Sequence, residues 1–125
     1  MEKLKQQNRP LLLDVRTAGE FKHGHIAGAV NIDIRQLERA LPRLSDYRYN
    51  EVIIYCETGS RARSAIPLLK DAGFTQLALA EGDMSGWRRA RLPSVRGTGQ
   101  AILPQPAPAP VVEPKPQLSQ AAAQQ

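Results

Sequence analysis

Apolar residues gather in four short runs, at residues 11–15, 29–32, 52–55 and 76–79. Each run is rich in aliphatic side chains and has the length of a β-strand rather than that of a helix. Within a run the apolar residues mostly follow one another instead of alternating with polar ones. This pattern predicts strands that are buried on both faces of a parallel sheet.

Between these runs the spacing of apolar residues becomes helical. Apolar positions recur at three- and four-residue intervals over residues 34–44 and 62–69, which predicts two amphipathic helices. We expect Pro42 to interrupt the first helix and Pro67 to bend the second, because proline has no amide hydrogen. Gly73 is the expected stop of the second helix.

A third, short helical turn is expected around Trp87, with Asp83 or Ser85 as its N-cap. Strands and helices therefore alternate along the chain. This order predicts an α/β fold of three layers, in which helices cover both faces of a mostly parallel sheet of four to five strands.

The composition of the chain changes near Gly97. Residues 97–125 contain six prolines, six glutamines, six alanines and no aromatic residue. Such a segment cannot bury enough apolar surface to fold, and its prolines favour extended polyproline II structure. We therefore predict one folded domain over residues 1–96 and a disordered tail over residues 97–125. A docking ligand for a proline-binding module is the alternative for the tail.

Charge and cysteine content narrow the function. The net charge is +5, but no dense basic run exists and only 5% of residues are aromatic, so we expect no nucleic-acid partner. A small anionic substrate fits the same charge. A single cysteine, Cys56, excludes an internal disulfide, a CxxC redox pair and a cysteine-rich zinc site.

Two further expectations concern location. No apolar stretch is long enough to span a membrane, and the N-terminus has no signal-like run. We therefore expect a cytoplasmic protein, or a periplasmic one if an upstream signal has been removed.

The single cysteine stands where α/β proteins bind their ligands. Cys56 follows the apolar run 52–55, and a helical stretch begins near Ser60. The N–H groups of a helix start point at this junction and carry partial positive charge. Gly59 lets the loop curl around the sulfur and Arg61 adds a cation, so the thiolate is favoured. A buried structural cysteine is the alternative.

Four segments, in order, resemble the rhodanese family of sulfurtransferases across about residues 8–93. They are Asp14-Val15-Arg16 with Glu20-Phe21, residues 24–32, residues 56–61, and residues 82–87 with Leu92-Pro93. The resemblance implies a rhodanese-like parallel sheet flanked by helices. It also implies the strand order second, first, third, fourth, and places the family's first edge strand before Met1, so that this strand is missing from the sequence.

The resemblance further implies a persulfide carried on Cys56. Sulfur would pass from a small anionic donor such as thiosulfate to cyanide, a thiol or a protein acceptor, with no metal or organic cofactor. The residues that would surround the substrate are Glu57, Thr58, Gly59, Ser60 and Arg61.

Loop length and two unusual residues refine this expectation. Four residues separate Cys56 from Arg61, whereas related cysteine phosphatases have five, so the loop fits one sulfane sulfur better than a phosphate group. Glu57 is expected to repel a dianion such as thiosulfate. Asp83 stands where the family usually has a second glycine. The alternative function is a persulfide relay or redox-regulatory module that acts on a protein partner with little thiosulfate turnover.

Two neighbouring residues are expected to be structural. Arg16 would pair with Asp14 or Glu20, and His25 would have an architectural role.

Overall fold

A computed structural model describes residues 9–98 and 103–108 of the chain. Its sheet has four parallel strands in the order β2-β1-β3-β4. The strands are β1 (Leu11–Asp14), β2 (Val30–Asn31), β3 (Glu51–Tyr55) and β4 (Gln76–Leu79). The predicted parallel sheet and the strand order implied by the family resemblance are both confirmed.

Helical segments connect the strands. They are α2 (Ala18–His23), η1 (Ile34–Gln36), α3 (Leu37–Ala40), η2 (Leu41–Tyr47), α4 (Ser60–Asp71) and α5 (Asp83–Arg89), where η marks a 3₁₀ helix. The helix predicted over residues 34–44 is broken into three pieces. Pro42 lies at the start of η2, where its missing amide hydrogen is tolerated. Pro67 lies inside α4, which continues across it to Asp71.

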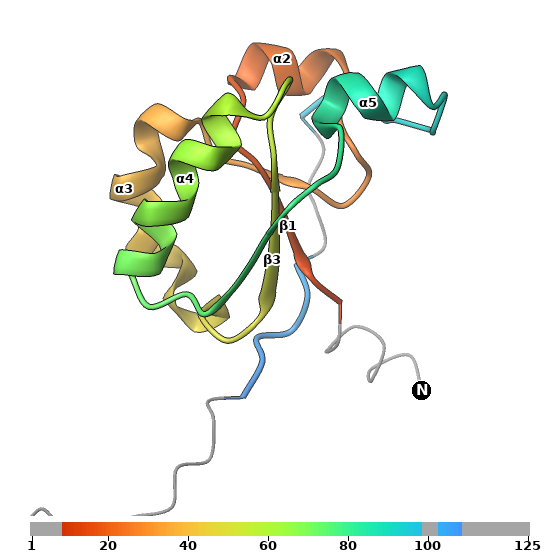
Figure 1. Cartoon of the computed structure of the whole chain (residues 1–125). Helices are drawn as coiled ribbons and strands as arrows, with labels where there is room; N and C mark the ends of the chain where they lie inside the picture. Colours follow the sequence, from red (N-terminus) through yellow and green to blue (C-terminus); the bar gives the residue numbers. More distant parts are fainter. Residues whose placement is uncertain (1–8, 99–102, 109–125) are drawn as a thin grey trace, which may run out of the picture.

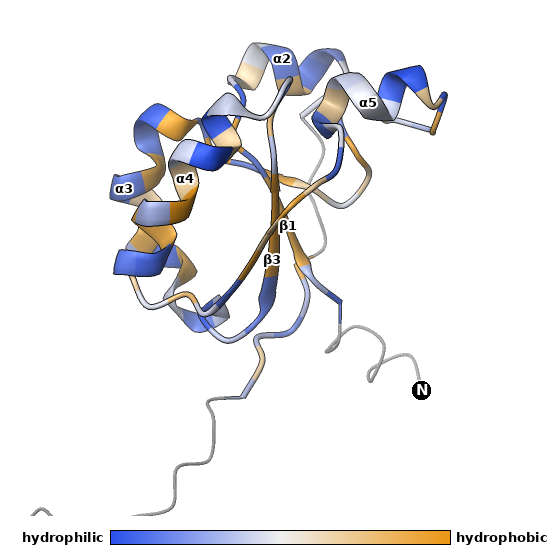
Figure 2. Cartoon of the chain, in the orientation of Figure 1, coloured by the Kyte–Doolittle hydropathy of each residue, from blue (hydrophilic) through white to orange (hydrophobic). Residues whose placement is uncertain are grey.

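One face of the sheet is covered by α3 and α4 (Figure 1). Alternate residues of β1, Leu11 and Leu13, are fully buried on this face. They pack against Leu37 of α3 and against Ala65 and Leu69 of α4. Figure 2 shows the corresponding apolar colouring of the strands and polar outer surfaces on both helices. This face holds the larger part of the core.

The other face is covered by α2 and α5 only near the carboxyl ends of the strands (Figure 1). Phe21 of α2 and Met84 of α5 are buried there beside Tyr55. The three-layer α/β fold is therefore confirmed. Burial on both faces is incomplete, however, because Leu12 and Ile53 are only half-buried where no helix covers them.

Part of the predicted tail lies against the domain. Pro104 is buried, and the Ala107 amide donates to Oδ1 of the buried Asn50 at 2.6 Å. Residues 99–102 and 109–125 lie outside the described residues, so the predicted disorder of the tail stays a prediction there. Within residues 9–98 and 103–108, no helix is long and apolar enough to cross a bilayer.

Candidate active site

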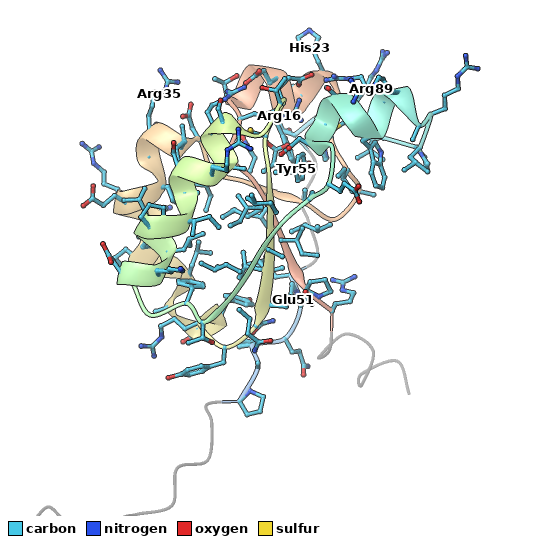
Figure 3. The ribbon with its side chains drawn as sticks, in the orientation of Figure 1. Arg16, His23, Arg35, Glu51, Tyr55 and Arg89 are labelled. Atoms are coloured by element: carbon cyan, nitrogen blue, oxygen red, sulfur yellow. The ribbon has the colours of Figure 1, made fainter. Side chains whose placement is uncertain are left out.

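The loop that follows β3 forms the centre of the candidate site. Cys56 is the first residue after β3, and α4 begins four residues later at Ser60. Parallel strands place this junction at their carboxyl ends. In Figure 3, Arg16 and Tyr55 lie at that end beneath α2 and α5, whereas Glu51 lies at the opposite end of β3. The predicted loop therefore lies at the carboxyl ends of the strands, where the sequence analysis expected it.

The sulfur of Cys56 receives two backbone N–H groups. The Gly59 amide donates to Sγ at 2.9 Å, and the Ala62 amide, in the first turn of α4, donates at 3.3 Å. Cys56 is only 1% exposed. These donors, together with the positive end of the helix dipole, stabilise negative charge on the sulfur. Ala62 was missed by the sequence prediction, which ended the cradle at Arg61.

The curl of the loop depends on Gly59. This residue has φ = +110°, a left-handed conformation in which glycine is favoured. A Cβ atom added there would lie 3.0 Å from Asp83 Oδ2 and 3.1 Å from Arg63 Nη1. Two charged side chains therefore crowd this glycine, and the predicted need for glycine is supported by the geometry.

The start of α5 holds the loop from its other side. The amides of Met84 and Ser85 donate to the carbonyl oxygens of Cys56 and Glu57 at 2.9 and 3.0 Å. Asp83 Oδ1 accepts a hydrogen bond from the Cys56 amide at 3.0 Å. The expectation that Asp83 or Ser85 caps α5 is wrong, because Gly82 occupies the N-cap and no side chain caps the helix. The Asp83 carboxylate instead contacts the backbone of the candidate nucleophile.

The Glu57 side chain forms two ion pairs. Its carboxylate accepts from Arg16 Nη1 at 3.2 Å and from both terminal nitrogens of Arg88. These guanidinium groups, Arg88 above all, hold the pKa of Glu57 below its usual range. The negative charge expected to repel a dianionic donor is thus balanced by two cations from β1's end and from α5.

Arg16 is itself one of the most buried side chains of the protein. It is 1% exposed and binds the fully buried Asp14 carboxylate through Nε at 3.1 Å and Nη2 at 2.8 Å. Nη2 also donates to the carbonyl of Gly24 at 2.7 Å. Asp14, not Glu20, is therefore the main partner, and this cluster joins the loops after β1 and β3.

Arg61 points to α2. Its guanidinium forms a two-point ion pair with Glu20, with Nη1–Oε1 and Nη2–Oε2 distances of 2.7 and 3.0 Å. Arg61 lowers the pKa of Glu20 to about 2. Thr17 forms a capping box with Glu20. This capping box holds the Glu20 carboxylate, the acceptor for Arg61, in place. The predicted cation is present beside the loop, but its charge is shared with Glu20.

The other predicted substrate residues lie at the rim. Thr58 and Ser60 are exposed, and neither side chain caps α4. His25 is buried, stacks on Phe21 at a ring separation of 3.5 Å, and faces the Phe21 carbonyl through Nδ1. This arrangement agrees with its expected architectural role. The described part of the chain contains no cluster of three His, Cys, Asp or Glu residues suited to a metal ion.

Comparison with known proteins supports the same family. The Rhodanese-like domain family matches residues 1–90. An uncharacterized Synechocystis protein is 29% identical over 96 residues, and the match covers 77% of this chain but 52% of that protein. The chain therefore spans about half the length of this relative.

A named enzyme and a solved structure are also similar to this chain. A sulfurtransferase of Allochromatium vinosum is 29% identical over 89 residues, with 71% of this chain and 81% of that protein covered. The crystal structure of a thiosulfate sulfurtransferase from Pseudomonas aeruginosa has a TM-score of 0.66 and 28% identity, covering 77% of this chain and 19% of that one. Both of these relatives are named as sulfurtransferases. The chain belongs to the Rhodanese-like domain family.

Proposed function

We propose that this domain moves a sulfane sulfur through a persulfide on Cys56. The observation that carries the proposal is the Sγ atom, which is buried at the start of α4 and faces the Gly59 and Ala62 amides. Donors preorganised around a sulfur stabilise its anionic forms without further rearrangement. The loop between Cys56 and Arg61 is also short enough for a single sulfur atom.

The reaction has two displacement steps. The Cys56 thiolate attacks the outer sulfur of thiosulfate, an S–S bond forms to Sγ, and sulfite leaves with the electron pair of the broken bond. Cyanide or a thiolate then attacks the same outer sulfur and releases the Cys56 thiolate. Sulfur is passed on without an external oxidant or reductant, as in covalent ping-pong catalysis.

Intact mass spectrometry of the reduced chain tests this function. Incubation with thiosulfate, or with the persulfide of cysteine, is expected to add one sulfur atom of about 32 Da, and cyanide should remove it. Cys56→Ser should gain no mass under the same conditions. A folded protein that gains no sulfur from either donor would contradict the proposal.

A second candidate function is delivery of the sulfur to an acidic protein acceptor. A cleft of about 780 Å³ lies beside β2, and its lining includes Arg35, Arg39 and Arg43. Thr17 also lines it and hydrogen-bonds Glu20, the partner of Arg61, so the cleft begins next to the candidate site. Within residues 9–98 and 103–108, Arg39 and Arg43 form no ion pair. Two unpaired cations favour an acidic partner.

Transfer from the persulfide form to a synthetic acidic peptide with one cysteine tests this candidate. The comparison peptide has glutamine in place of each acidic residue and keeps the cysteine. We expect faster transfer to the acidic peptide, and loss of that preference in Arg39→Gln with Arg43→Gln. The matched control, Arg48→Gln with Lys70→Gln, removes two charges elsewhere and should keep the preference. Equal rates for both peptides would contradict an acidic partner.

A further inference from the structure

Four carboxylates lie around the Cys56 loop, and three of them form ion pairs with arginines. Asp14 pairs with Arg16, Glu20 pairs with Arg61, and Glu57 pairs with Arg16 and Arg88. Among the residues that the structure describes, Asp83 forms no ion pair. Asp83 is therefore the carboxylate of these four that has no arginine bound directly to it.

Asp83 also lies against the sulfur cradle itself. Oδ1 accepts from the Cys56 amide at 3.0 Å, and Oδ2 lies 3.0 Å from the Cβ position of Gly59, whose amide donates to Sγ. Because a cysteine amide lies within about 3 to 4 Å of its own sulfur, the carboxylate and Sγ are within about 7 Å of each other. Arg63 Nη1 lies 3.1 Å from the same Cβ position, which places it within about 6 Å of Oδ2, but it forms no ion pair with Asp83 among the described residues. A donor bonded to Sγ therefore lies in the electrostatic field of a carboxylate that no cation of the described residues binds directly.

The backbone of Asp83 is unusual as well. Its φ is +54°, so it holds a left-handed conformation that most side chains avoid and that aspartate tolerates better than most. A glycine would adopt this conformation without cost. The left-handed backbone and the part-buried hydrogen bond to Cys56 together indicate that the carboxylate has a role at the site.

We propose that Asp83 is a specificity-determining residue that disfavours dianionic sulfur donors and favours persulfides of thiols. This inference rests on the proposed sulfur transfer through Cys56. In the favoured reaction, the Cys56 thiolate attacks the outer sulfur of a protonated persulfide. A new S–S bond forms to Sγ, the donor's own S–S bond breaks, and a thiolate leaves with the electron pair while the proton stays on the transferred sulfur.

The size of the effect follows from charge and distance. Thiosulfate carries two negative charges, whereas a protonated cysteine persulfide carries no net charge. Removing one charge within about 7 Å, in a partly solvated site, should change the loading rate of a dianion by about tenfold. The neutral donor should be nearly unaffected. This charge effect belongs to Asp83 rather than to Glu57, because arginines balance Glu57.

The experiment measures second-order rate constants for sulfur loading of Cys56 by intact mass. Asp83→Asn keeps an oxygen acceptor for the Cys56 amide and removes the charge. Its rate with thiosulfate should rise about tenfold, its rate with cysteine persulfide should change less than about twofold, and the gain should shrink at high salt. Asp83→Gly relieves the left-handed backbone and should show the same change in donor preference. Glu81→Gln, an exposed neighbour, should leave both rates unchanged.

Two results would overturn the inference. One is an unchanged or lower thiosulfate rate in both Asp83 variants, and the other is an equal change for the two donors, which indicates a structural role. Failure of the proposed function looks different, because then neither donor loads sulfur onto the wild-type chain.

Discussion

The Arg16 guanidinium donates from Nη1 to Glu57 Oε1 at 3.2 Å, which links the end of β1 to the residue after the candidate nucleophile. The link crosses 41 positions of sequence. It exists because β1 and β3 are adjacent parallel strands whose carboxyl ends meet at one edge of the sheet. The loop that carries Cys56 is therefore braced by a buried charge on the neighbouring strand.

Replacing Arg16 by methionine should destabilise the domain by about 3 to 5 kcal/mol, because Asp14 would remain buried without its partner. Urea unfolding measures the loss. Arg35→Met is the matched control, since Arg35 is 76% exposed and pairs with Asp33 at the surface; it should cost less than about 1 kcal/mol. Equal losses in the two variants would contradict the buried role of Arg16.

Arg88→Gln should slow loading by thiosulfate about threefold, because Glu57 would lose its exposed partner and present more negative charge to the donor. The double variant with Glu57→Gln should return close to the wild-type rate. Rate constants at low and high salt measure the coupling, and salt should reduce it. A double variant as slow as Arg88→Gln alone would show that the arginine acts independently of Glu57.

Gly59→Ala should reduce sulfur loading at least tenfold. The new methyl group would meet Asp83 and Arg63 at 3.0 to 3.1 Å and would strain a backbone at φ = +110°. Gly28→Ala is the control, because Gly28 also has a positive φ, +88°, but nothing lies within 4 Å of its Cβ position. That control should lose about 1 kcal/mol of stability and load sulfur normally. Normal loading by Gly59→Ala would contradict the amide cradle.

Glu20 predicts a pH-dependent part of the stability. Arg61 lowers its pKa from the ordinary 4.5 to about 2, so the pair stabilises the fold above about pH 4.5 and stops doing so as the pH falls towards 2. Both side chains are about one third exposed, which limits the contribution to about 1 kcal/mol.

The free energy of unfolding of Glu20→Gln should therefore depend less steeply on pH between about 4.5 and 2 than that of the wild type. Glutamine retains an acceptor for the capping box, so the helix start is preserved. Glu38→Gln, an exposed change on α3, should leave the pH dependence as it is. Parallel curves for Glu20→Gln and the wild type would contradict the ion pair.

Asn50→Ala should release residues 103–108 from the domain, because the Asn50 side chain accepts from Ala107 and lies near Gln105. Hydrogen exchange at the Ala107 amide measures the release, and exchange there should become faster. The amides of β3 should stay protected in the same sample, which separates local release from unfolding. Unchanged exchange at Ala107 would show that Asn50 does not hold the segment.

Local sequence determined the elements and the place of the chemistry. Short apolar runs specify strands because each strand buries its own side chains, and a cysteine between a strand and a helix start specifies the loop because both features are contiguous in sequence. The hydrogen bond from the Gly59 amide to Cys56 Sγ and the α/β fold class both follow from such local signals. The break in the helix near Pro42 follows too, since it depends on one missing amide hydrogen.

Tertiary structure decided which charged side chains lie around Cys56 and how they pair. Glu57 was expected to repel donors, but arginines from β1's end and from α5 lie against it, and Arg61 is shared with Glu20 of α2. Asp83 was expected to cap a helix and instead binds the Cys56 amide. These partners are 27 to 41 positions apart, and only the packing of four strands and their helices determines which charges meet. Electrostatic interactions depend on distance in space, which a linear pattern of residues does not contain.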